Sequence, residues 1–82
     1  MKLKLIYVQT GSDGTQRIIK EELLEEASDE PMSKRQATEI ILRSRPGLRP
    51  LLVRATDFPA DWLVQVDPRE SNGVRIYASI SP

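Results

Sequence analysis

The side chains of this sequence that could do chemistry are carboxylates, hydroxyls and basic groups, because it contains neither cysteine nor histidine. The absence of cysteine and histidine excludes thiolate nucleophiles, disulfides, imidazole bases and the common ligands of structural zinc. The acids Asp57, Asp61, Asp67 and Glu70 are the remaining candidates for metal binding or acid–base work. Their spacing does not match a calcium loop, and nothing indicates the burial that a catalytic carboxylate pair requires. We therefore expect no metal, no cofactor and no enzymatic activity.

A glycine-containing segment at 11–15, Gly-Ser-Asp-Gly-Thr, stands where a phosphate-binding loop would, after an expected strand and before an expected helix. It lacks the Gly-Lys-Ser/Thr of a P-loop and the three spaced glycines of a dinucleotide fingerprint. The carboxylate of Asp13 would also repel phosphate. The segment is therefore predicted to be a plain turn.

An acidic run is the first candidate for binding. On a helix, Glu21, Glu22, Glu25 and Glu26 would fall within an arc of ~140°, opposite an apolar side. Such runs often do no more than solvate a helix face. The favoured interpretation is a non-catalytic regulator or inhibitor that uses this acidic helix face to bind a larger protein with a basic surface.

A basic segment at 34–54 supports a competing interpretation, a regulator that binds nucleic acid. Phosphate contacts require several basic side chains on one surface. Glu39 is the one acid between residues 34 and 54, and the candidates are Lys34, Arg35, Arg43, Arg45, Arg49 and Arg54. Arg43 and Arg45 also have a structural explanation, because the C-terminal end of a helix favours cations. Twelve basic and twelve acidic side chains balance over the whole chain, so net charge does not choose between the interpretations.

The helices that would position these residues are predicted over 15–28 and 33–45. Ser33 and Gln36 form a capping box at the start of the second helix, and Pro46-Gly47 ends it. For 15–24 the alternative is a second strand, joined to the first through a hairpin turn at Ser12-Asp13-Gly14. Strict alternation of apolar and polar residues fails there, so the helix is preferred.

Strands are predicted from alternating or continuous apolar residues over 2–9, 51–55, 62–66 and 74–80. The element order is then β-α-α-β-β-β. It predicts an α+β fold in which a small, four-stranded, mostly antiparallel sheet carries two helices on one face. At 82 residues the chain is long enough for one domain, spanning 1–82.

Aromatic residues give two further surfaces. Tyr77 is expected on the outer face of the sheet beside Arg75, where such a pair could stack on bases, although a plain polar face is the favoured interpretation. Trp62 is expected in the core. Phe58 is either a core residue or an anchor at a protein interface, and the hairpin tip at 69–73 is a secondary contact.

No apolar run is long enough for a secretory signal or a membrane span, so we expect a cytoplasmic protein that does not enter membranes. Small cysteine-free domains without catalytic residues include regulators and inhibitors encoded by phages and mobile elements, and this size class suggests such an origin. A homodimer joined through an exposed sheet edge is the third interpretation.

Overall fold

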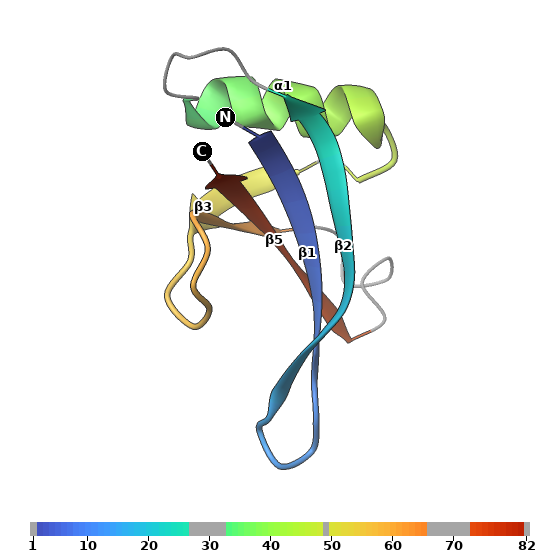
Figure 1. Ribbon diagram of the computed structural model, residues 1–82, viewed down its shortest axis with the longest axis vertical. Helices are drawn as coiled ribbons and strands as arrows, with labels where there is room; N and C mark the ends of the chain where they lie inside the picture. Colours follow the sequence, from blue (N-terminus) through green and yellow to red (C-terminus); the bar gives the residue numbers. More distant parts are fainter. Residues whose placement is uncertain (1, 27–32, 49, 66–72, 82) are drawn as a thin grey trace.

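The computed structural model describes residues 2–26, 33–48, 50–65 and 73–81. Within these ranges the protein has a five-stranded antiparallel sheet and one helix (Figure 1). Along the sheet the strand order is β2-β1-β5-β4-β3. The elements are β1 (Lys2–Thr10), β2 (Gln16–Glu26), α1 (Lys34–Ser44), β3 (Leu51–Arg54), β4 (Trp62–Gln65) and β5 (Val74–Ser81). The fold combines helix and sheet as expected, but the prediction of four strands with two helices is wrong.

Residues 16–26 form a strand, and this is the main correction. Gly14 has a φ of 86°, in the left-handed region that favours glycine. Its amide donates to the Gly11 carbonyl at 3.0 Å. The Thr15 amide and hydroxyl both donate to Asp13 Oδ1, at 3.1 and 2.6 Å. This tight turn directs the chain back along β1, so β2 gains a hydrogen-bonding partner that outweighs the helix preference of its glutamates.

Two β-bulges explain why the apolar pattern of β2 is misleading. Its pairing with β1 skips one residue of β2 at two places, Ile19 and Leu24. Each extra residue interrupts the alternation of side chains between the two faces of a sheet. A strand with two such interruptions has no strict period of two, which is why a helix was preferred from the sequence.

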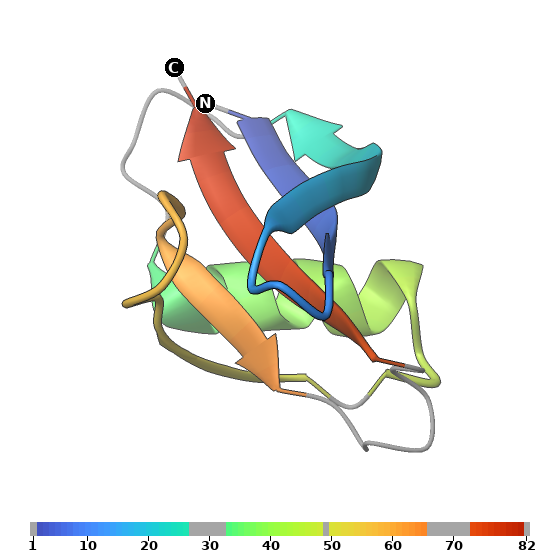
Figure 2. The same ribbon diagram turned by 90° about the horizontal axis from the view of Figure 1, so that it is seen from below.

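The main core lies between α1 and one face of the sheet. The predicted capping box is confirmed: the Gln36 amide donates to Ser33 Oγ at 3.2 Å, and the Ser33 amide donates to Gln36 Oε1 at 2.9 Å. The helix lies across one face of the sheet (Figures 1 and 2). Trp62 packs against this core and is partly buried. The buried residues are Leu3, Leu5, Ala37, Ile40, Ile41, Leu52, Val64, Ile76 and Ala78.

A second, smaller core lies on the opposite face of the sheet. It consists of Ile6, Val8 and Tyr77, and the loop between β3 and β4 packs over it. Tyr77 lies on the face away from the helix, as expected, but it is fully buried there, so the expectation that it is exposed is wrong. Phe58, in that loop, is partly buried and stacks on Tyr77 with a centroid separation of 4.6 Å. The face that sequence patterning treated as polar is therefore partly apolar and covered.

Two carboxylates connect this loop to β5 through hydrogen bonds. Asp57 accepts a hydrogen bond from the Tyr77 hydroxyl at 2.8 Å and another from the guanidinium of Arg75. Asp61, the residue immediately before β4, accepts a hydrogen bond at its Oδ2 from the Ile80 amide at 2.7 Å. Asp57 and Asp61 therefore act as structural acceptors. Asp67 and Glu70 lie outside the described residues.

Candidate binding surface

The four glutamates of the predicted acidic face lie along β2, and Glu21 and Glu22 are directed to opposite faces of the sheet. Residues paired across a sheet share a face. Glu22 pairs with Leu5 of the main core face, whereas Glu21 pairs with Ile6 of the opposite face. The backbones of Glu25 and Glu26 likewise pair with successive residues of β1. The single acidic helix face therefore does not exist.

Glu22 has a role within the fold. Its Oε1 accepts a hydrogen bond from the guanidinium of Arg45, which follows α1, and Lys20 Nζ lies 3.5 Å from its Oε2. The Glu22 side chain is only 17% exposed, and its Oε2 makes no hydrogen bond to any described residue despite the nearby lysine. Glu22 and Arg45 thus join the edge strand to the end of the helix, and neither presents a free charge.

This ion pair predicts how stability depends on pH. The hydrogen bond from Arg45 holds the pKa of Glu22 below its ordinary value of 4.5. A lowered folded-state pKa gives stability that is present above the unfolded pKa and lost as pH falls through the folded one. We expect Glu22→Gln to cost less than about 1 kcal/mol at neutral pH and to flatten the fall in unfolding free energy below pH 4.5.

Urea unfolding across the acid range measures this effect. Some acid dependence should remain, because hydrogen bonds from Thr15 also lower the pKa of Asp13. Glu39→Gln is the matched control, since Glu39 forms an exposed pair with Arg35 at 3.7 Å. If Glu22→Gln retains the same acid dependence as the wild type, the link to Arg45 does not contribute to it.

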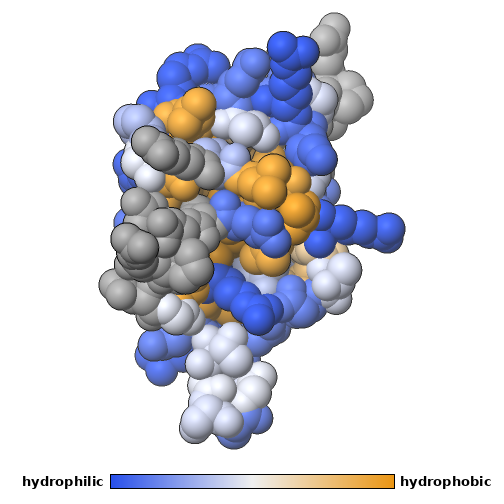
Figure 3. Space-filling model, turned by 180° about the vertical axis from the view of Figure 1, so that it is seen from behind, coloured by the Kyte–Doolittle hydropathy of each residue, from blue (hydrophilic) through white to orange (hydrophobic). Residues whose placement is uncertain are grey.

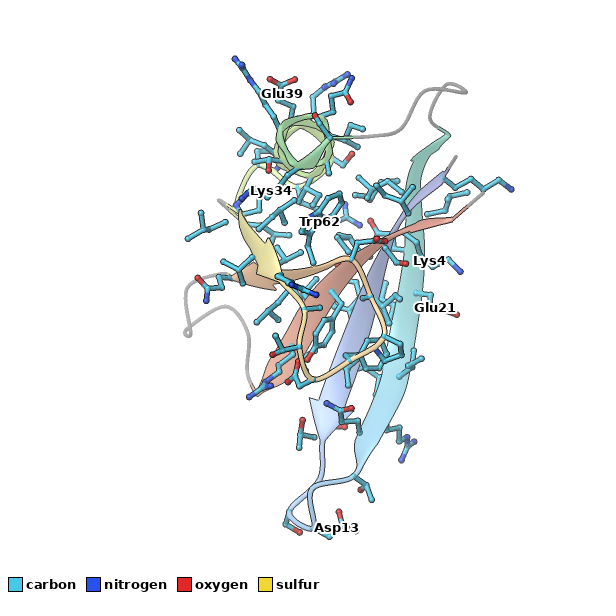
Figure 4. The ribbon with its side chains drawn as sticks, turned by 90° about the vertical axis from the view of Figure 1, so that its left-hand side faces the viewer. Lys4, Asp13, Glu21, Lys34, Glu39 and Trp62 are labelled. Atoms are coloured by element: carbon cyan, nitrogen blue, oxygen red, sulfur yellow. The ribbon has the colours of Figure 1, made fainter. Side chains whose placement is uncertain are left out.

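The basic candidates are spread over α1, its C-terminal end and β3. Arg35 and Arg45 already pair with glutamates. Figure 4 shows Lys34 directed towards β3, while Glu39 lies on the outer side of the helix. Lys34, Arg43 and Arg54 form no ion pair with a described residue, and Arg49 lies outside the described ranges. Glu39 and the two ion pairs therefore interrupt the positive surface that phosphate binding would need.

The feature that sequence reasoning missed is the outer edge of β2, an 11-residue strand at one end of the sheet order. Three of the five large apolar side chains exposed among the described residues lie on it: Ile18 at 50%, Ile19 at 47% and Leu23 at 52%. Had 15–28 been a helix, Ile19 and Leu23 would have faced the core. The adjacent β-branched pair Ile18-Ile19 after a glycine turn was the available signal for a hairpin strand.

The other exposed apolar residues do not form one continuous surface. Leu42 lies on α1 and Leu51 on β3. On the side seen in Figure 3, the apolar area beneath the helix is interrupted and bordered by hydrophilic side chains. Among the described elements, β2 therefore has the most exposed large apolar side chains, and it is also a strand at the edge of the sheet.

The hydrogen-bond pattern shows which backbone groups β2 presents. In an antiparallel sheet, successive residues direct their N–H and C=O groups to opposite neighbours. The Ile80 amide is directed to Asp61 on the β4 side, so its partner Leu3 turns its own backbone groups towards β2. The backbone N–H and C=O groups of the alternate residues of β1 then point towards β5; these residues are Lys4, Ile6 and Val8. The residues of β2 that pair with them direct their own N–H and C=O groups outward, away from the sheet. Those residues are Leu23, Glu21 and Ile18.

Comparison with family models, with curated proteins and with solved structures finds no match. Among the described residues there is no group of three or more acids that could hold a metal ion. No described helix has the length and apolar character needed to cross a membrane. Of the predicted protein-binding residues, Glu22 and Phe58 are engaged within the fold, and Glu21 lies 3.5 Å from Lys4 (Figure 4).

Proposed function

We propose that this protein is a non-catalytic regulator that binds a larger protein by accepting one of its extended segments as an additional strand beside β2. The supporting observation is the outer edge of β2, with outward backbone groups at Ile18, Glu21 and Leu23 and exposed apolar side chains among them. Strand addition takes affinity from backbone hydrogen bonds and specificity from alternate side chains. The edge replaces the acidic helix face as the binding element.

The charges of β2 indicate the chemistry of the segment. The strand is basic at its start, with Arg17 and Lys20, and acidic from Glu21 to its end. In an antiparallel addition, the N-terminal part of the incoming segment lies beside the acidic end of β2. Opposite charges across a strand pair are stabilising. The preferred segment is therefore extended, basic in its first half and acidic in its second.

A peptide library displayed on phage and selected against the immobilised protein tests this proposal. We expect the selected peptides to show that charge order and to lose at least about tenfold in affinity for Leu23→Pro. Proline removes an outward N–H and is tolerated on sheet edges. Leu23→Ala separates the backbone contribution from the side-chain one, and Leu42→Ala, at an exposed position of α1, is the control. Peptides that bind Leu23→Pro as well as the wild type would exclude the β2 edge.

The nucleic-acid alternative is tested by titrating binding to random-sequence DNA and RNA with salt. Phosphate contacts weaken steeply as salt rises. We expect no binding at low salt, because the basic residues of α1 are interrupted by Glu39 and partly paired. Salt-sensitive binding that is lost in a Lys34→Glu, Arg43→Glu double variant would favour nucleic acid over protein as the partner.

A further inference from the structure

The order of charges along β2 is complementary to that of a second β2 strand in antiparallel orientation. A segment that is basic first and acidic last is what β2 accepts in antiparallel orientation, and β2 itself has this order. We propose that a second copy of this chain occupies the edge, with the two β2 strands paired antiparallel about a two-fold axis at Glu21. This inference rests on the proposed role of β2 as a strand acceptor and names its partner.

Symmetry, backbone direction and the charges of β2 together select the axis. In a two-fold antiparallel pair with the axis perpendicular to the sheet, the residue on the axis lies opposite itself. Its N–H and C=O can bond to the copy only if they point outward. Ile18, Glu21 and Leu23 all meet this condition, and we place the axis at Glu21 because Lys20 and Glu22, which carry opposite charges, flank it. The resulting register places Lys20 of each copy opposite Glu22 of the other. Glu22 is already paired with Arg45 and lies near Lys20 within its own chain, so these two contacts between copies add to existing ion pairs on either side of the axis.

The same register sets a limit on the strength of the dimer. Two Glu21 carboxylates lie across from each other, and like charges directly opposite are destabilising. Each carboxylate has Lys4 Nζ 3.5 Å away on its own chain, and this positive charge partly offsets the repulsion between the two Glu21 side chains. The bulges at Ile19 and Leu24 confine the regular pairing to the residues between them. The dimer is therefore weak and exchanges readily with another strand that uses the same edge.

Sedimentation equilibrium over a range of concentrations tests the inference. We expect the wild type to form dimers and Leu23→Pro to remain monomeric. Two charge variants of the same strand should act in opposite directions. Glu21→Gln removes the repulsion and should tighten the dimer about fivefold, whereas Lys20→Gln removes an attraction and should weaken it about fivefold. Glu39→Gln on α1 is the control that should leave the dimer unchanged. Circular dichroism verifies that each variant is folded.

The outcomes separate this inference from the proposed function. A wild type that stays monomeric up to about 1 mM overturns the dimer, since its affinity would be negligible. The strand-acceptor role then stands if selected peptides still bind and Leu23→Pro still weakens them. A dimer that persists in Leu23→Pro, or that responds to Glu21→Gln and Lys20→Gln in the same direction, uses another surface and also overturns the inference. If the wild type neither self-associates nor binds any selected peptide, the proposed function is overturned as well.

Discussion

Replacing Tyr77 with alanine is expected to lower the free energy of unfolding by about 3–5 kcal/mol, the range found for truncating a large buried aromatic. Tyr77 is fully buried and is the largest side chain of the second core. Its ring stacks on Phe58 at 4.6 Å, and its hydroxyl donates to Asp57 at 2.8 Å. Removing it leaves a cavity beneath the loop between β3 and β4 and removes the loop's main contact.

The effect is large relative to the stability of such a small chain. At about 0.05–0.15 kcal/mol per residue, this length corresponds to a total of roughly 4–12 kcal/mol, so Tyr77→Ala is expected to lose at least about a quarter of the stability of the protein. Urea unfolding followed by tryptophan fluorescence measures the difference. Tyr77→Phe is the matched control: it keeps the ring and should cost about 1–2 kcal/mol, for the lost hydrogen bond and the acceptor left at Asp57. Equal costs for the two variants would mean that the second core does not contribute as described.

Replacing Ile41 with alanine is expected to cost about 2–4 kcal/mol, because it leaves a cavity between the helix and the sheet. Among the described residues, α1 buries Ala37, Ile40 and Ile41, and Ile41 is fully inaccessible. The neighbouring Leu42 is 46% exposed and points away from the core. Leu42→Ala should therefore change stability by no more than about 0.5 kcal/mol.

The two helix variants are compared by thermal and urea unfolding, with far-ultraviolet circular dichroism to follow the helix. The two substitutions are at adjacent positions of α1, so helix propensity and chain context are nearly the same. The difference in burial then accounts for the difference in stability. We expect one cooperative transition in both, shifted to lower urea in Ile41→Ala only. If the two variants are equally stable, α1 does not pack on the sheet through the face described.

The helix and most of the strands could be predicted from the sequence, because their signals are local. Ser33 and Gln36 lie three residues apart and satisfy each other's backbone amides, so the start of α1 depends on no distant residue. β1, β3, β4 and β5 begin and end close to the predicted positions because apolar runs, prolines and glycines bound them. The absence of cysteine and histidine likewise excluded whole classes of chemistry without reference to structure.

The conformation of 16–26 and the candidate site followed only from the tertiary structure. A strand obtains its hydrogen bonds from another segment, so β2 exists because the turn at Gly14 places it beside β1. The bulges at Ile19 and Leu24 remove the alternation that would have revealed it. Burial of Tyr77 likewise depends on a loop that folds back from β3. Local pattern determines which residues can form an element, whereas the free edge of β2 is defined by which strands lie beside it.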